Sequence, residues 1–150
     1  MFMKVINKNI LEISDGLICH ACNCQNKFGK GLAKSIKDKF PQVYHEFLKF
    51  SSLYKFPKDR LGKIQEVSIN KNLSVVNIFS QLYYGNSKET GIDYNNYSEM
   101  RKCFIELSKI RNNRPIYFPY GFGSGLAGGD WNKISGMIEE YFPDVVYCKI

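Results

Sequence analysis

The stretch GLICHACNCQNKFGKGLA, residues 16–33, passes from a β-rich run through a glycine-containing connection into a helical pattern. Its first six residues predict a strand, and apolar residues at every fourth position over 32–40 predict a helix. A second stretch, PYGFGSGLAGGDW at 119–131, joins the predicted strand PIYFP (115–119) to the last predicted helix. If both strands are parallel members of one sheet, both connections leave from carboxyl ends, where ligands bind in open α/β sheets. We therefore expect the two connections to converge on one cleft.

Short β-rich runs alternate with amphipathic segments along the rest of the chain. Val, Ile, Phe and Tyr content predicts further strands at 63–69, 73–80 and 144–150, and MKVIN (3–7) is a candidate for another. Further helices are predicted after Pro41, over 97–110 and over 134–141. This alternation indicates an α/β layered fold with a largely parallel sheet, which the antiparallel hairpin of 63–69 and 73–80 makes mixed. A chain of 150 residues fits one domain, 1–150.

The composition is that of a globular protein. Hydrophobic residues make up 44% and charged residues 23%, which excludes a disordered tail, a collagen-like repeat and a coiled coil. No apolar run approaches the roughly 20 residues of a membrane span, and the N-terminus lacks the apolar core of a signal peptide. We expect a cytoplasmic protein without a membrane partner.

The net charge of +7 favours a polyanionic partner, either nucleic acid or a phosphorylated small molecule. The lysines are spread along the chain without a dense block, so a dedicated nucleic-acid stripe is not evident. Five cysteines, an odd number, are expected as reduced thiols. Cys19, Cys22 and Cys24 crowd beside His20, but zinc sites usually join two ligand pairs and no second pair exists, so no metal is expected.

The second glycine-rich connection is almost bare of side chains. Its glycines at 121, 123, 125, 128 and 129 let backbone N–H groups approach and cradle phosphate oxygens. The helix that starts near Asp130 is expected to add its positive N-terminal end. The alternative interpretation is a flexible or tightly turned loop, with glycines present for conformational reasons only.

Two familiar nucleotide motifs are excluded. Residues 123–128 satisfy G-x-G-x-x-G, but a dinucleotide fingerprint needs an acidic residue at the end of the next strand, about 20 residues on. Here the remaining 22 residues end in an apolar strand without that acid. Residues 29–31 lack the order of a P-loop. Neither an ordinary NAD-dependent dehydrogenase nor a P-loop ATPase fits.

Four segments in order, over nearly the whole chain, resemble the macrodomain family in its ADP-ribose-1″-phosphate-processing and phage-type branch. They are KNILE, ICHACNCQNKFGKGLAKSIKDKFP, NIFSQ with TGIDY downstream, and PYGFGSGLAGGDW. The resemblance implies a three-layer α/β/α fold with a central mixed, largely parallel sheet. It also implies that ADP-ribose binds across the carboxyl ends of that sheet and that no cofactor is needed.

The resemblance implies binding roles residue by residue. Asn9 and Ile10 stand where the family has an Asp and its neighbour that read adenine, and Asn23 matches the asparagine that contacts the distal ribose. The other implied contacts are Gly29, Lys30 and Gly31 around that ribose, Lys27 or Lys30 at a distal phosphate, and Gly121, Phe122, Gly123, Ser124, Gly125 and Leu126 around the pyrophosphate, with Phe122 packing over the ligand. The alternatives are a turn residue for Asn23 and a core aromatic for Phe122.

The resemblance also implies His20 and Asp130 as the reacting pair. Phosphomonoester hydrolysis needs one group to orient or deprotonate water and another to assist the leaving group, and imidazole titrates near the working pH. The alternatives are a hydrogen-bonded core histidine and a helix N-cap. A related branch uses a lysine with an Asp where this chain has Ala127, so that mechanism is doubtful here.

The leading hypothesis is a hydrolase acting at the distal ribose, an ADP-ribose 1″-phosphate phosphatase. The alternatives are an ADP-ribose reader without turnover, and a hydrolase that removes ADP-ribose from macromolecules or deacetylates O-acetyl-ADP-ribose. A basic binder of single-stranded nucleic acid ranks last, because the aromatic residues mostly fall at core spacings. We expect a monomer whose partner is an ADP-ribose derivative or an ADP-ribosylated macromolecule.

Overall fold

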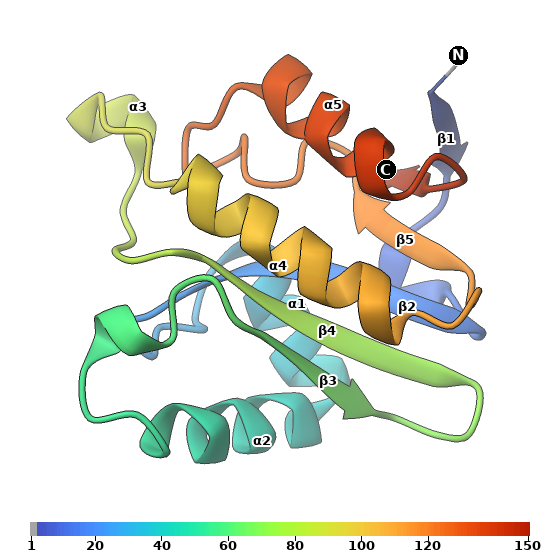
Figure 1. Cartoon of the computed structure of the whole chain (residues 1–150), viewed down its shortest axis with the longest axis horizontal. Helices are drawn as coiled ribbons and strands as arrows, with labels where there is room; N and C mark the ends of the chain where they lie inside the picture. Colours follow the sequence, from blue (N-terminus) through green and yellow to red (C-terminus); the bar gives the residue numbers. More distant parts are fainter. Residues whose placement is uncertain (1–2) are drawn as a thin grey trace.

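The computed structural model describes residues 3–150 and contains one six-stranded sheet (Figure 1). Its strands are β1 (Lys4–Asn7), β2 (Gly16–Asn23), β3 (Ile64–Ser68), β4 (Leu73–Gln81), β5 (Ile116–Pro119) and β6 (Val146–Lys149). Its helices are α1 (Gly31–Lys39), α2 (Pro41–Ser52), the short α3 (Ser87–Thr90), α4 (Tyr97–Ile110) and α5 (Trp131–Tyr141), with 3₁₀ turns η1 (Ile10–Glu12) and η2 (Pro57–Asp59). Every strand and every long helix that the sequence predicts is present.

The sheet has the order β1-β6-β5-β2-β4-β3. All neighbours are parallel except β3 and β4, which form the predicted antiparallel hairpin. The central strands β2 and β4 are buried on both faces, which explains their nearly continuous apolar sequences. The predicted mixed, largely parallel sheet is therefore confirmed.

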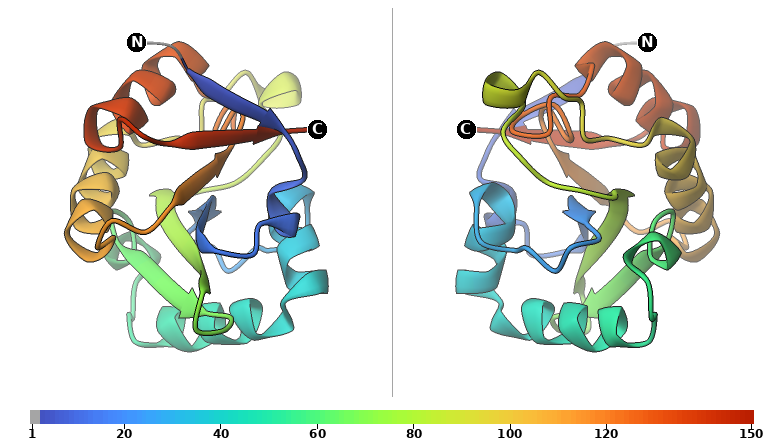
Figure 2. Two further views of the ribbon diagram at one scale, coloured as in Figure 1. Left: turned by 90° about the vertical axis from the view of Figure 1, so that its right-hand side faces the viewer. Right: turned by 90° about the vertical axis from the view of Figure 1, so that its left-hand side faces the viewer.

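Alternate side chains of the central strands enter two separate cores. Leu17 and Cys19 pack with α4 and α5 on one face, whereas Ile18 and Cys22 pack with α1, α2 and η1 on the other. This alternation follows from the two-residue period of a strand. The helices accordingly lie in two layers on opposite faces of the sheet (Figure 2). The predicted three-layer α/β/α architecture is confirmed.

Local signals set where the long helices start. Pro41 opens α2, and the Asn96 side chain accepts a hydrogen bond from the Glu99 backbone N–H at the start of α4. The sequence analysis did not predict α3, η1 or η2. Each has only three or four residues, which is too short for a hydrophobic period to show.

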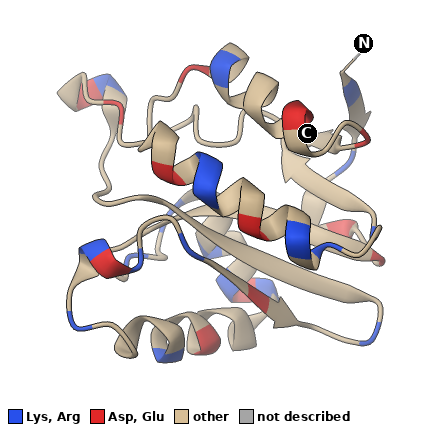
Figure 3. Ribbon diagram, viewed as in Figure 1, with Lys and Arg blue, Asp and Glu red and all other residues tan. Residues whose placement is uncertain are grey.

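Lys and Arg residues are distributed over most elements of the fold (Figure 3). All five cysteines are free thiols and buried. Within residues 3–150, no three His, Cys, Asp or Glu side chains are grouped so that they could hold a metal ion. No helix in this part of the chain is long and apolar enough to cross a membrane.

Candidate functional site

Three connections leave the same edge of the sheet. Because β2, β4 and β5 are parallel neighbours, their carboxyl ends at Asn23, Gln81 and Pro119 lie together at one edge. They continue into the β2–α1 loop (residues 24–30), the β4–α4 connection (82–96) and the β5–α5 loop (120–130). The two glycine-rich connections therefore leave from adjacent strands at one edge, as predicted.

The β5–α5 loop is a fixed turn. Gly123 and Gly128 have positive φ angles of 73° and 75°, a region that side chains strongly disfavour. A Cβ on Gly128 would lie 2.0 Å from the Ser87 hydroxyl oxygen. The loop is also anchored internally, because the Gly129 N–H and the Ser124 hydroxyl donate to loop carbonyl groups. The glycines at 123 and 128 therefore have a conformational reason, as the tightly turned form of the alternative interpretation holds, and this does not exclude an anion-binding role for the loop amides.

The β4–α4 connection braces the β5–α5 loop from outside. The backbone N–H groups of Ser87 and Tyr94 donate to the carbonyls of Leu126 and Ala127, both at 2.8 Å. The Asn95 Nδ2 donates to the Gly123 carbonyl at 2.8 Å. Sequence reasoning missed these residues because long-range contacts to backbone groups leave no local pattern. The only available signal was the TGIDY segment, which overlaps the connection.

The hydrogen bonds from the β4–α4 connection go to carbonyl groups of the β5–α5 loop and leave several backbone N–H groups of that loop unpaired. The N–H groups of Gly123, Gly125, Leu126 and Ala127 donate to no atom of the described residues. Gly125 and Leu126 are also exposed, and a Cβ on Gly125 would meet no atom within 4 Å. Unpaired backbone N–H groups on an exposed loop are the type of donor that binds phosphate oxygens.

The β2–α1 loop is organised by Asn23. Its Oδ1 accepts hydrogen bonds from the backbone N–H groups of Gln25 and Lys27, and its Nδ2 donates to the Lys27 carbonyl. This is the turn role that the sequence left open as an alternative. The loop ends at the exposed residues 29–31, and α1 begins after Lys30 without a side-chain cap. The first N–H groups of α1 are therefore available to an anion.

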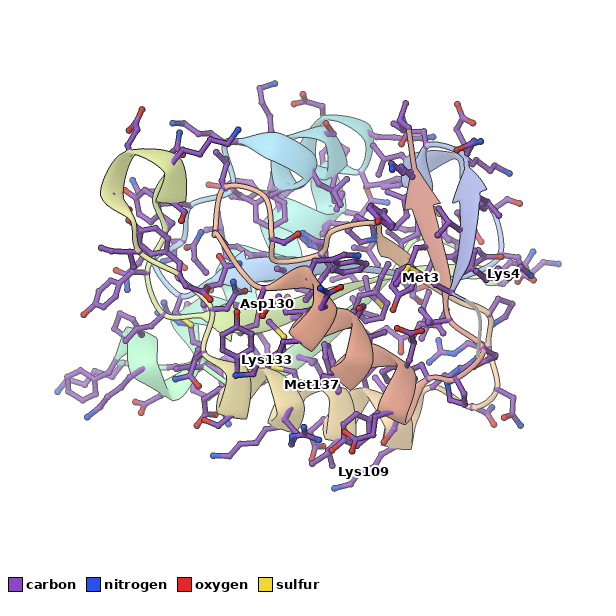
Figure 4. The ribbon with its side chains drawn as sticks, turned by 90° about the horizontal axis from the view of Figure 1, so that it is seen from above. Met3, Lys4, Lys109, Asp130, Lys133 and Met137 are labelled. Carbon is purple, nitrogen blue, oxygen red and sulfur yellow. The ribbon has the colours of Figure 1, made fainter. Side chains whose placement is uncertain are left out.

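In contrast to α1, helix α5 has a capped start. The Asp130 Oδ1 accepts a hydrogen bond from the Lys133 N–H at 3.3 Å, so the helix start is already capped by a carboxylate. Asp130 and Lys133 lie together at this end of α5 (Figure 4). The expectation that α5 offers the open positive end is corrected, because the uncapped helix end at this edge belongs to α1.

A hollow of about 620 Å³ lies against the β4–α4 connection. It is lined by Leu82, Tyr83 and residues 92–98, all from the β4–α4 connection and the start of α4. Its lining contains aromatic and amide side chains and one carboxylate, Asp93, but no Lys or Arg. Asp93 is already engaged by the Tyr97 hydroxyl and by Asn95. The hollow therefore suits a neutral, partly aromatic group better than a phosphate.

His20 lies in the middle of β2 and is only 2% exposed. The Asn77 Nδ2 donates to Gln65, so the Asn77 Oδ1 faces the His20 Nε2 and accepts a hydrogen bond from its N–H. The His20 Nδ1 is buried without a partner among the described residues, and the Phe28 ring packs edge-on against the imidazole. Burial lowers the pKa of His20 to about 4, so the ring is neutral at physiological pH.

Relatives of known sequence cover most of the chain, although no family model matches it. An uncharacterised 17.5 kDa protein of Enterobacteria phage T4 is 25% identical over 148 residues, which cover 94% of this chain and 90% of the phage protein. An ADP-ribose 1″-phosphate phosphatase of Saccharomyces cerevisiae is 23% identical over 155 residues, covering 87% and 86% of the two chains.

Solved structures decide the fold. The macrodomain of Mycobacterium tuberculosis DarG superposes with a TM-score of 0.78 at 17% identity, over 99% of this chain and 97% of that chain. The chain has the macrodomain fold. Thermosipho africanus DarTG, solved in complex with ADP-ribose, superposes with a TM-score of 0.71 at 16% identity, over 91% of this macrodomain and 38% of that chain.

Two of the predicted binding residues of the macrodomain lie in its core. Phe122 is 2% exposed and packs against Phe104 and Phe118, so it does not cover a ligand. The Ile10 side chain is likewise buried, in the α1–α2 core, which leaves its backbone for the predicted adenine contact. The prediction that Phe122 packs over the ligand is corrected, because its ring faces a core. Phe122 instead fixes the start of the β5–α5 loop to the sheet.

The remaining predicted residues lie at the loop edge of the macrodomain. The half-buried Asn9 follows β1, whose carboxyl end is at this edge, and its Oδ1 caps η1 by accepting from the Leu11 N–H at 3.0 Å. Lys27 and Lys30 are exposed on the β2–α1 loop. Ser124 donates to the Gly121 carbonyl, and Leu126 is 47% exposed.

The structure does not bring His20 and Asp130 together. The His20 side chain enters the α1–α2 side of the sheet, where it contacts Phe28, whereas Asp130 caps α5 in the opposite layer. No hydrogen bond or ion pair joins them within the described residues. Their catalytic roles therefore remain predictions, and direct cooperation between them requires movement.

Burial of neutral His20 predicts a pH-dependent stability. The folded pKa of about 4 lies below the ordinary value of 6.5, so the unfolded chain binds the proton more readily than the folded one. Stability is therefore lost as pH falls from about 6.5 to 4, by about 3 kcal/mol from this group. Denaturant unfolding at several pH values measures the loss.

His20→Gln is the matched control for this prediction. The variant keeps a donor for Asn77 but does not titrate, so its stability should decline less over this range. Equal declines in the two proteins would contradict the assignment of the pH dependence to His20.

Proposed function

We propose that this macrodomain binds ADP-ribose derivatives at the loop edge of its sheet and hydrolyses a bond at their distal ribose. The observation that carries the proposal is the set of free amides in the β5–α5 loop, at the same edge of the sheet as the uncapped start of α1. A diphosphate offers acceptor oxygens to N–H groups that have no partner in the protein. The Thermosipho relative solved with ADP-ribose and the Saccharomyces phosphatase support the same ligand class.

The substrate we favour is ADP-ribose 1″-phosphate. In the proposed arrangement, Asn9 and the Ile10 backbone lie toward the adenine, the β5–α5 loop holds the diphosphate, and residues 29–31 surround the distal ribose. Lys27 and Lys30 are exposed cations on the β2–α1 loop and are available to the terminal phosphate. This assignment follows the order in which the strand ends lie along the sheet edge.

His20 is our candidate for the group that accepts a proton from water. Its imidazole is neutral and its Nδ1 is an unoccupied acceptor. A general base works best with a pKa near the operating pH, so the role requires that the Phe28 side chain move aside, which admits water and raises the pKa of His20 from its buried value of about 4. Asp130 is exposed and its second oxygen has no hydrogen-bond partner among residues 3–150, so it is the second candidate.

Phosphate release from ADP-ribose 1″-phosphate tests the enzymatic role. His20→Gln should lower kcat by about 100-fold if His20 is the base, with ADP-ribose affinity almost unchanged. Asp130→Asn keeps the α5 cap, because asparagine is also a good N-cap, so any loss of kcat reports on the lost charge alone. Unchanged turnover in either variant would remove that residue from the mechanism.

One observation favours a second candidate, a hydrolase or reader of macromolecule-linked ADP-ribose. The hollow lined by the β4–α4 connection has no cation in its lining, and a substrate with a terminal phosphate does not need it. A larger group attached to the distal ribose could occupy it. Tight binding of ADP-ribosylated macromolecules, without phosphate release from ADP-ribose 1″-phosphate, would favour this candidate over the phosphatase.

A further inference from the structure

Arg60 is a buried arginine outside every motif of the sequence. It follows η2 and is 7% exposed. Its guanidinium donates to three backbone carbonyls: Nε to Ser51 at 3.1 Å, Nη1 to Cys24 at 2.8 Å and Nη2 to Tyr54 at 3.3 Å. None of the ion pairs formed within residues 3–150 includes it.

A buried cation without a carboxylate partner is costly, and the three carbonyls must compensate for its lost hydration. Ser51 lies in the last turn of α2 and Tyr54 lies just after the helix, where the helix dipole favours a positive charge. An apolar side chain would fill this space without that desolvation cost. The advantage of arginine is geometric, because one planar group joins its own segment to the end of α2 and to the β2–α1 loop.

The third carbonyl, that of Cys24, connects Arg60 to the candidate functional site. Cys24 is the first residue of the β2–α1 loop, and its N–H donates to the Gln81 carbonyl at 2.9 Å. Arg60 holds its carbonyl, so both backbone groups of Cys24 are fixed. Cys24 follows Asn23, whose side chain orders the loop through Gln25 and Lys27. The chain is therefore anchored where this turn begins.

We propose that Arg60 is a positioning residue that holds the β2–α1 loop in its ligand-binding conformation, an inference that rests on the proposed function. Arg60 acts through the Cys24 carbonyl and is assigned no contact with the ligand. Without the hydrogen bond from Arg60 to the Cys24 carbonyl, which we call the Arg60 clamp, the β2–α1 loop spends part of its time in other conformations. Apparent affinity then falls by the fraction of molecules that remain competent to bind.

The test compares Arg60→Met and Arg60→Lys with the wild type by calorimetry with ADP-ribose, well below the melting temperature of each protein. We expect Arg60→Met to bind about tenfold more weakly, because the competent loop becomes a minor state. Lysine keeps the cation but not the planar fork, so Arg60→Lys should bind with intermediate affinity. If Arg60→Met does not fold, Arg60→Lys alone decides the comparison.

Hydrogen exchange provides a readout that uses no ligand. The amides of Gln25 and Lys27 should exchange about tenfold faster in Arg60→Met, since one opening equilibrium governs exchange and affinity. Arg114→Met is the matched control. Arg114 also donates to backbone carbonyls and pairs with Glu66, but it precedes β5 at the opposite edge of the sheet. Its loss should lower stability and leave both the affinity and the exchange at 25 and 27 unchanged.

Two results would overturn the proposal. One is an Arg60→Met affinity within about twofold of the wild type. The other is an equal loss of affinity in Arg114→Met, which would show a general effect of destabilisation. Failure of the wild type to bind ADP-ribose would refute the proposed function itself. The exchange comparison would then still show whether Arg60 orders the loop.

Discussion

Replacing Gly125 with glutamate is expected to weaken ADP-ribose binding by about 100-fold while the protein remains folded. A Cβ at this position meets no atom within 4 Å, and the φ angle of Gly125 is not in the positive region, so the fold tolerates a side chain there. Gly125 belongs to the same short loop as the other free amides, those of Gly123, Leu126 and Ala127. A carboxylate placed there excludes and repels a diphosphate. Calorimetry measures the loss of affinity, and thermal unfolding checks the fold.

Gly136→Glu is the matched control for this substitution. Gly136 is exposed on α5 and a Cβ there also meets no atom within 4 Å, so the two variants carry the same charge change at unhindered positions. The control should bind ADP-ribose with wild-type affinity, and it should be slightly stabilised because glutamate favours a helix over glycine. If Gly125→Glu also bound normally, the β5–α5 loop would not be the diphosphate site.

Phe122→Ala is expected to destabilise the protein by about 3–5 kcal/mol, a large part of the stability of an ordinary domain. The Phe122 ring is enclosed by Phe104 and Phe118, with ring centroids at 6.2 and 5.0 Å, so truncation leaves a cavity in the α4–α5 core. Denaturant unfolding gives the change in the free energy of unfolding.

Leu126→Ala provides the comparison for Phe122, since Leu126 lies on the same loop but is 47% exposed. Its truncation should change the free energy of unfolding by no more than about 0.5 kcal/mol. A small stability loss in Phe122→Ala together with a large loss of ADP-ribose affinity would contradict the core assignment. It would return Phe122 to the role of covering the ligand.

The sheet could be predicted well from the sequence because strands and hairpins leave local or periodic patterns of apolar and turn residues. The apolar runs of β2 and β4 indicate strands that are buried on both faces, and the short connection between residues 69 and 73 indicates the hairpin. Once both glycine-rich connections follow parallel strands, their position at one edge is a consequence of topology. The loop edge could therefore be predicted without coordinates.

The roles of individual site residues could not be predicted to the same extent. The alternation of β2 places His20 on a face, but only the packed structure shows that Phe28 and Asn77 enclose it. The same holds for Phe122, since a phenylalanine between glycines has no local signal for burial. The hydrogen bonds of Arg60 join it to residues that lie 6 to 36 positions away in the chain, beyond the range of any sequence pattern.

Backbone amide NMR spectra recorded during an ADP-ribose titration show which N–H groups contact the ligand. We expect the largest shifts at Gly123, Gly125, Leu126 and Ala127 and in the first turn of α1, residues 31–33. AMP, which lacks the diphosphate bridge and the distal ribose, should shift fewer of these amides. Saturable binding of ADP-ribose that leaves all of them unshifted, or no binding at all, would contradict the proposed binding site.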